Sequence, residues 1–279
     1  VLGYQQDGQF VNKLNDVQYI RNTHFVAGFE WNTASRSKVT VEGYLKNWDN
    51  YPFLLRDSVS LANLGGDFGV LGNEPVVSTS QGRSYGLEFL FQQRLFKGFY
   101  GIASYTLGWS EFTDKNGDFV SSSWDARHIV NVAVGKKFGK DWEVGINWRF
   151  QSALPDTPFD ASSSLVANWD VNGRGIRDFD RINSIRQEAS STLDIRVDKK
   201  WFFKKWSLNL YVDIENITGN AVNRNELILD RPLDENNMPI GDGIIVNPNA
   251  PMDQQRYQLK TIEDAQGTLV PSIGIMIEI

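Results

Sequence analysis

The chain has 279 residues, enough for one large all-β domain or two ordinary ones. It contains no Cys, which excludes disulfides, iron–sulfur clusters and thiolate zinc sites. A net charge of −6 and a pI near 5.1, without a basic patch interleaved with aromatic residues, argue against nucleic acid as a partner. No apolar run approaches the roughly 18 residues of a membrane helix, yet a mean hydropathy of −0.36 is compatible with a membrane barrel, whose polar lumen and loops lower the average.

Apolar and polar residues alternate with a period of two in about nine segments, which is the pattern of a strand whose two faces meet different surroundings. The clearest alternation is in residues 142–151, where Trp142, Val144, Ile146, Trp148 and Phe150 oppose Glu143, Gly145, Asn147, Arg149 and Gln151. The other predicted strands cover residues 24–31, 37–48, 82–95, 99–112, 125–138, two strands within 191–218 joined by a link at 203–205, and 271–279.

The connections between these strands alternate between long and short. Residues 1–23 are expected to form a loop, and the long connections lie at 49–81, around 114–118, at 153–189 and at 219–267. A soluble up-and-down barrel or sandwich would also alternate in sequence, but it would not explain why every second connection is long. Most of the predicted strands have ten or more residues, against about 5–6 in ordinary sheets, and a strand that crosses a membrane needs about 9–11. This combination predicts a transmembrane barrel, with short turns at one rim and long loops at the other.

Aromatic residues gather beside the short turns, as expected for side chains at the level of lipid headgroups. They are Trp31, Phe99, Phe138, Trp142, Trp201, Phe202, Phe203 and Trp206. Basic residues gather there too, and we interpret them as a solvated rim: Arg36, Lys97, Lys136, Lys137, Lys140, Lys204 and Lys205. In such a barrel the apolar face meets lipid and the ionic face lines the lumen.

Three stretches resemble the late strands of TonB-dependent outer-membrane receptors, and their amino-acid sequence is most similar to that of receptors from Bacteroidota. They read SYGLEFLFQQRLFKGFYGIASYTLGWSEF, WDARHIVNVAVGKKFGKDWEVGINWRFQSALPDTPFD and LDIRVDKKWFFKKWSLNLYVDIENIT. The resemblance implies a plugged barrel of about 22 strands in the bacterial outer membrane, which imports a scarce nutrient (a siderophore, cofactor, glycan or peptide). The implied partners are membrane lipid, a plug domain, the remaining strands, the TonB complex and a surface lipoprotein.

The chain departs from that family pattern in three ways. It has about nine predicted strands, no match to the plug or to the TonB-contacting segment, and a final Ile279 where outer-membrane strands usually end in an aromatic residue. Nine strands alone would leave unpaired edges in lipid. We therefore expect residues 1–279 to form part of a single barrel domain, as the carboxy-terminal part of a receptor or as one fragment of a larger assembly.

Six charged residues are predicted to face the lumen and its plug: Glu88, Arg127, Arg149, Asp194, Arg196 and Asp213. The alternative is a passive, plug-free porin, whose strand pattern would be identical. An outer-membrane enzyme is a third hypothesis, but the sequence lacks a convincing set of acid, base and nucleophile. The G-x-S-x-G match at 82–86 opens a strand rather than a strand–turn–helix elbow. We predict no catalytic residue, no cofactor and no metal site.

Overall fold

The computed structural model describes residues 5–34, 36–65, 74–221, 226–262 and 267–279. It divides into two compact units. The first comprises Val1–Pro155, Glu188–Val222 and Gln266–Ile279, and the second comprises Asp156–Gln187 and Asn223–Ala265. The expectation of a single barrel domain stays a prediction.

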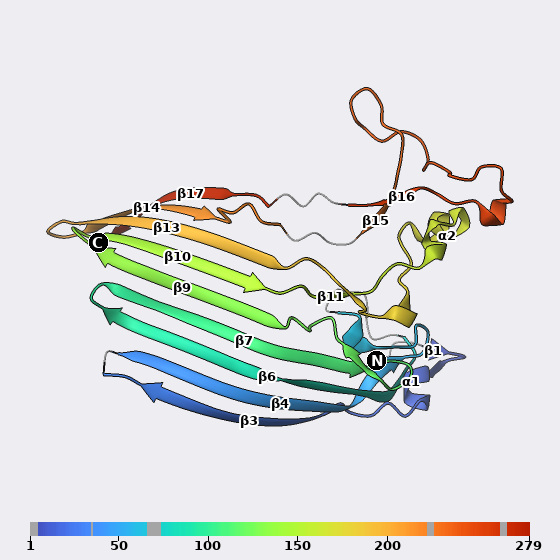
Figure 1. The fold of residues 1–279 in the computed structure, drawn as a ribbon, viewed down its shortest axis with the longest axis horizontal. Coiled ribbons are helices and arrows are strands. Elements are labelled where there is room, and N and C mark those ends of the chain that lie inside the picture. Colours follow the sequence, from blue (N-terminus) through green and yellow to red (C-terminus); the bar gives the residue numbers. More distant parts are fainter. Residues whose placement is uncertain (1–4, 35, 66–73, 222–225, 263–266) are drawn as a thin grey trace. The chain divides into compact units, whose positions relative to one another are not determined.

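The first unit contains a sheet in which nine long antiparallel strands follow one another in chain order (Figure 1). All nine predicted strands are present. They are β3 (Arg21–Asn32), β4 (Ser37–Leu54), β6 (Val76–Phe96), β7 (Phe99–Thr113), β9 (His128–Phe138), β10 (Trp142–Gln151), β13 (Ser190–Phe202), β14 (Ser207–Glu215) and β17 (Val270–Glu278).

The four short turns lie at one end of this sheet, on the left in Figure 1, which we call the short-turn end. The turn between β6 and β7 shows why it is tight: Lys97 and Gly98 both have positive φ, 50° and 81°. Two such residues in succession are typical of the hairpin turn whose twist matches that of its strands. The long connections therefore leave from the opposite end.

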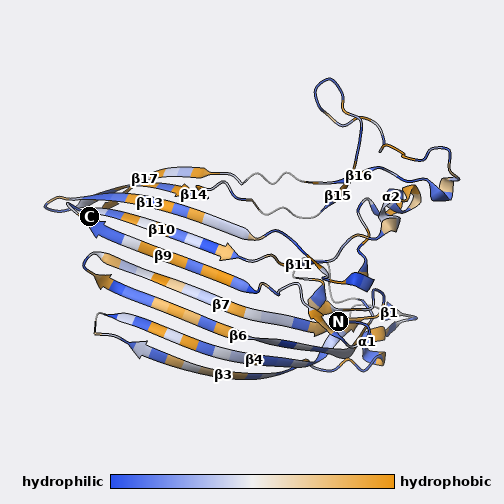
Figure 2. Ribbon diagram, in the orientation of Figure 1, coloured by the Kyte–Doolittle hydropathy of each residue, from blue (hydrophilic) through white to orange (hydrophobic). Residues whose placement is uncertain are grey.

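The two faces of the sheet differ in chemistry, as Figure 2 shows by the alternating colours along each strand. The register places Val144 opposite Val197, Ile146 opposite Ile195 and Trp148 opposite Leu193. These residues define the apolar face. The other side, the charged face, carries Glu143, Asn147 and Arg149. Because directly opposed residues share a face, one register fixes the faces of every neighbouring strand.

A small buried core lies at the long-connection end of the first unit. The end of β4 pairs with β5 (Val59–Ser60), which leads into the 3-10 helix η1 (Leu61–Asn63). The buried apolar side chains there are Leu54, Val59, Ala62, Val76 and Phe112. The sheet between this core and the short turns buries little, so its apolar face has no covering layer among the described residues.

The segment before the sheet is more ordered than the predicted loop. It contains β1 (Gln5–Gln6), β2 (Gln9–Phe10) and the short helix α1 (Val11–Leu14). The Asn12 side chain donates to the Glu74 carbonyl at 2.8 Å and accepts from the Val76 amide at 2.7 Å. These two bonds attach the segment to the start of β6.

The second unit is built from two of the predicted long loops. Its elements are η2 (Ala161–Ser164), α2 (Val166–Asn172), η3 (Phe179–Arg181), β12 (Ile185–Arg186), which pairs with β11 (Pro155–Asp156), β15 (Leu227–Leu229), η4 (Met252–Gln254) and β16 (Leu259–Thr261). Trp169 and Tyr257 are buried in it, and the Tyr257 hydroxyl lies 3.1 Å from the Asp170 carboxylate.

Several boundaries differ from the sequence-based expectation. The long strands β4 and β6 continue into the predicted loop at 49–81, whereas β9 begins at His128 instead of 125. The short strand β8 (Phe119–Ser121) lies in the next connection. The predicted loop parts at 1–4, 66–73, 222–225 and 263–266, and Ser35 of the first turn, lie outside the described residues.

Candidate functional site

The centre of the charged face is an ion pair between neighbouring strands β10 and β13. Arg149 Nη2 lies 3.1 Å from Asp194 Oδ2, and Asn147 Nδ2 donates to the same oxygen at 3.0 Å. The other carboxylate oxygen of Asp194 accepts a hydrogen bond from the backbone amide of Asn216 at 2.9 Å. Asp194 is the more enclosed partner, since its side chain is 14% exposed against 57% for Arg149. Asp194 on β13 therefore links β10 to Asn216, the residue that directly follows β14.

A second ion pair lies along β13 itself. Arg196 makes a two-pronged contact with Asp198, at 2.8 Å and 2.9 Å, because residues two apart in a strand share a face. Its guanidinium also lies 3.9 Å from the ring centre of Tyr211 on β14. Asp213 is directly opposite Arg196 in the register, yet Arg196 donates through Nε and Nη2 to Asp198. Asp213 is thus next to the Arg196–Asp198 pair, but the main partner of Arg196 is Asp198.

The charged face is also neutralised near the short-turn end. Lys137 lies 3.6 Å from Glu143, which accepts a hydrogen bond from the Tyr100 hydroxyl. Lys200 lies 2.5 Å from Glu278 of the last strand. The first pair joins the adjacent strands β9 and β10, and the second reaches across β14 from β13 to β17. Acids and bases on this face are therefore distributed as local pairs and do not form a block of one sign.

Glu88 is an exception. The register places it directly opposite Glu42 on β4 and Thr106 on β7. Neither glutamate has a cationic side chain within ion-pair distance among the residues that the structure describes. Two like charges directly opposite each other destabilise a strand pair. This part of the charged face therefore has an unneutralised negative charge.

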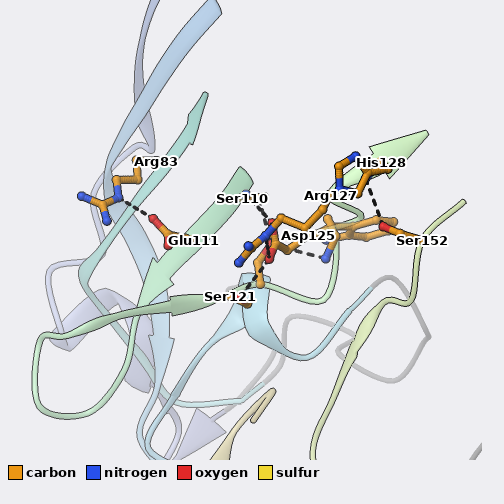
Figure 3. Close-up of polar contacts among 10 residues, drawn as sticks. Arg83, Ser110, Glu111, Ser121, Asp125, Arg127, His128 and Ser152 are labelled. Atoms are coloured by element: carbon orange, nitrogen blue, oxygen red, sulfur yellow. Dashed lines mark hydrogen bonds and ion pairs between the residues drawn. The ribbon is translucent and has the colours of Figure 1, made fainter. Parts of the chain in front are cut away.

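Arg127 lies before the start of β9, at the end of a long connection, although the sequence placed it within a strand. Figure 3 shows its side chain directed at Asp125, and the Nε–Oδ2 distance is 3.1 Å. Asp125 is 1% exposed and also accepts from the Ser110 amide and the Ser121 hydroxyl. Arg127 therefore holds the long connection together.

A hollow of about 1140 Å³ lies against the charged face. Its lining brings together four of the six residues predicted from sequence, namely Arg149, Asp194, Arg196 and Asp213. Glu88 and Arg127 are not among its lining residues. Sequence reasoning missed Tyr100, Asn147 and Asn216 as partners of the charges, since a hydrogen-bond partner on another strand can be found only when the register is known. That the six residues face a lumen and a plug stays a prediction.

Other candidate chemistry is not assembled in the described part of the chain. Across those residues, no group of three or more His, Asp or Glu side chains is placed to hold a metal ion. The G-x-S-x-G match at 82–86 lies in a strand, as predicted, but within β6 and not at its start. His128 Nδ1 is 2.9 Å from the Tyr105 hydroxyl, and Asp125 is occupied by Arg127.

The apolar face is exposed over its whole width. Phe29 on β3 is 65% exposed and Ile273 on β17 is 72% exposed. Between them the face carries further exposed apolar side chains, including Leu87, Phe91, Val134, Ile146, Trp148, Trp201 and Val212. Monomeric soluble proteins rarely expose a contiguous apolar patch of this extent. No helix in the described ranges is both long and apolar enough to cross a membrane.

Several solved structures to which this chain is similar are outer-membrane receptors. The ferripyoverdine receptor of Pseudomonas aeruginosa matches with a TM-score of 0.54 at 15% identity, over 78% of this chain and 26% of its own. The ferric-catecholate import receptor Fiu from E. coli K12 matches with a TM-score of 0.52 at 11% identity, over 75% of this chain and 25% of its own. The ferric citrate transporter FecA matches with a TM-score of 0.51 at 17% identity, over 92% of this chain and 31% of its own.

The antiparallel sheet has the same fold as part of these receptors. These likenesses confirm the predicted fold class, all-β and antiparallel, and they agree with the predicted outer-membrane location. The chain spans about a quarter to a third of the length of these receptors. No family model and no curated protein sequence matches it.

Proposed function

We propose that this chain forms part of the wall of a TonB-dependent outer-membrane receptor, which actively imports a scarce nutrient. Its apolar face meets lipid, and its charged face lines a lumen occupied by a plug domain. The more specific resemblance to receptors of Bacteroidota rests on the amino-acid sequence alone. The energy for transport comes from the TonB complex, through a part of the receptor outside this chain.

The observation that carries this proposal is the combination of an exposed apolar face with a charged face that neutralises itself. Arg149–Asp194, Arg196–Asp198 and Lys200–Glu278 place opposite charges side by side across or along the strands. Paired charges suit a wall packed against another protein domain, because burial of an unpaired charge is costly. A plug that presents a basic side chain to Glu42 and Glu88 would neutralise the remaining acidic pair.

The substrate class is a small, scarce solute that outer loops can enclose. The three receptors above are named for ferric catecholate, ferripyoverdine and ferric citrate, and a siderophore is therefore the first class to test. A cofactor, a glycan and a peptide are the others.

The deciding experiment is electrical. The full-length protein in a planar bilayer should pass negligible current, and cellular uptake should require both TonB and the proton-motive force. The double variant Arg196→Gln with Asp213→Asn should add leak current while ligand capture by the outer loops persists. A steady, large and ion-selective conductance of the unmodified protein would contradict the receptor and favour a porin, because the same face would then line an open channel.

A further inference from the structure

Two lysines lie on the apolar face, where the proposed function places lipid. Lys136 on β9 is opposite Phe99 on β7 and Val144 on β10. Lys199 on β13 is opposite Trp142 on β10 and Leu210 on β14. Both are close to the short-turn end, and neither is explained by a barrel wall alone, because a cation in contact with hydrocarbon is costly.

Both side chains carry their charge toward the short turns. Lys136 Nζ donates to the Lys97 carbonyl oxygen at 3.3 Å, and Lys199 Nζ donates to the Lys140 carbonyl oxygen. Their ammonium groups lie over aromatic rings: Nζ of Lys136 is 3.4 Å from the ring centre of Phe99, and Nζ of Lys199 is 5.4 Å from that of Trp201 and 5.7 Å from that of Trp142. Long cationic side chains near a membrane surface extend in this way to reach the headgroups.

The two lysines differ from their neighbours in having no counter-ion. Lys137 and Lys200, one position further along each strand, face the charged side and are paired with Glu143 and Glu278. Across the described ranges, neither Lys136 nor Lys199 has a carboxylate within ion-pair distance. An ammonium group has three donors, and each of these two uses one on a turn carbonyl, so donors remain for an anion.

The register also sets the distance between them. Lys136 and Lys199 lie on either side of β10 on the same face, Lys136 opposite Val144 and Lys199 opposite Trp142. Two strand spacings of about 4.8 Å and an offset of two residues, about 7 Å, place their backbones about 12 Å apart. Two flexible lysine stems can close that gap onto one phosphate group, for which lysine serves as a point charge.

We propose that Lys136 and Lys199, with Trp142 beside Lys199, bind the phosphate of an anionic glycerophospholipid in the leaflet at the short-turn end. The inference rests on the proposed function, since it requires the apolar face to contact lipid. Anionic headgroups are attracted by basic residues at the membrane surface. The acyl chains would then lie along the apolar face, over Val144 and Ile146.

The test uses the purified full-length receptor in detergent, with native mass spectrometry to measure the affinity for phosphatidylglycerol and for phosphatidylcholine. The unmodified protein should prefer phosphatidylglycerol. Lys136→Gln with Lys199→Gln should lower that affinity roughly tenfold or more. The matched control, Lys137→Gln with Lys200→Gln, removes the same charge from the opposite face and should leave the affinity unchanged.

Lys136→Arg with Lys199→Arg retains the charge and should retain most of the preference, which guards against a folding defect in the glutamine variant. An equal loss in both glutamine pairs, or no preference in the unmodified protein, would overturn the site. Displacement of the lipid by excess glycerol 3-phosphate would also overturn it, since that result identifies a site for free phosphate esters.

A separate measurement distinguishes failure of the site from failure of the proposed function. Brominated phosphatidylcholine in vesicles should quench tryptophan fluorescence in every variant, because Trp142 and Trp148 lie on the apolar face. Quenching without a preference for phosphatidylglycerol would overturn the lysine site alone. Absence of quenching would overturn both the lipid-facing wall and the site.

Discussion

The guanidinium of Arg149 on β10 binds the carboxylate of Asp194 on β13 at 3.1 Å, although the residue directly opposite Arg149 is Thr192. The contact is diagonal across the strand pair, within reach of a long side chain. Asp194 accepts two further hydrogen bonds, from Asn147 and Asn216, so the carboxylate is the centre of this group and the arginine is one of its three donors.

This asymmetry predicts unequal effects of neutralising the two partners. Arg149→Gln should lower the free energy of unfolding by about 0.5–1 kcal/mol, because its side chain is more than half exposed. Asp194→Asn should cost more, about 1–3 kcal/mol, because three donors lose a charged acceptor. Denaturant titration of the refolded receptor followed by tryptophan fluorescence measures both. Equal costs would contradict the central position of Asp194.

The two faces of β10 predict opposite responses to a new charge. Ile146→Arg places a cation on the apolar face, and it should lower stability by about 2–4 kcal/mol if that position is near the middle of the bilayer. The control is Ala133→Arg, since Ala133 on β9 is exposed and lies opposite Asn147 on the charged face. It should cost little. Folding yield in lipid vesicles and denaturant titration compare the two variants.

Labelling provides an independent test of the same assignment. Cysteines at Glu143, Asn147 and Arg149 should react with a water-soluble thiol reagent, whereas cysteines at Val144, Ile146 and Trp148 should be protected in vesicles. The protein has no native Cys to confuse the result. Labelling of the apolar set alone, or of both sets equally, would contradict the lipid-facing assignment.

Two glycines that face each other provide a sharper test of packing. Gly135 on β9 and Gly145 on β10 are directly opposed on the charged face. A Cβ on Gly135 would come within 2.2 Å of the Tyr100 ring, whereas a Cβ on Gly145 would have no heavy atom within 4 Å. Gly135→Ala should therefore destabilise the protein by about 1–3 kcal/mol and Gly145→Ala should not. Tyr100→Ala should remove most of the difference, and a difference that persists would exclude the ring as its cause.

A pH effect is expected in the second unit at Asp160, the residue before η2. Hydrogen bonds from the Ser162 side chain and amide lower the pKa of Asp160 below its usual value, and Ser162 N lies 2.7 Å from Oδ1. A carboxyl whose pKa is lowered by folding contributes stability that is fully present above its unfolded pKa, about 3.9, and is lost as pH falls through the folded value.

Amide exchange across Ala161–Ser164, corrected for the intrinsic rate, should therefore accelerate below pH about 4. Asp160→Asn keeps a capping oxygen without a titrating group and should remove this pH dependence. Asp160→Ala should lose protection at every pH. Retention of the acid-induced change in the asparagine variant would assign it to another carboxyl.

The strands could be predicted from sequence wherever one register continued from turn to turn. The prediction of a strand at 142–151 matches β10 residue for residue, because the alternation between the two faces is not interrupted anywhere along it. It failed after Trp48, where Asn50 has a positive φ of 58° and the pairing with β6 shifts. A bulge adds one residue to one strand, so the alternation changes phase and the continuing strand resembles a loop.

The charged face could be predicted as a set of residues but not as a set of partners. Period-two spacing placed Asp194 and Arg196 on the correct side of their strand. The choice of Asp198 over Asp213 by Arg196 depends on side-chain reach and on the Tyr211 ring, and neither is encoded in the spacing. Arg127 was wrongly placed in a strand. It binds Asp125 in the connection, and β9 begins only at the next residue, His128.

The unequal lengths of the strands determine how far each part of the sheet would extend beyond a bilayer. A strand needs about 9–11 residues to cross the bilayer, and β10 has 10 residues whereas β6 has 21. Because the short turns share one end, β6 continues 11 residues further than β10, roughly 36 Å along the strand, and in the proposed receptor these residues extend past the membrane at the other end. That extension has its own buried support in Leu54, Val59 and Val76, so it can stand in water without lipid. In the proposed receptor this side of the sheet would form a self-supporting rim above the lipid, whereas β10 would end near the membrane surface.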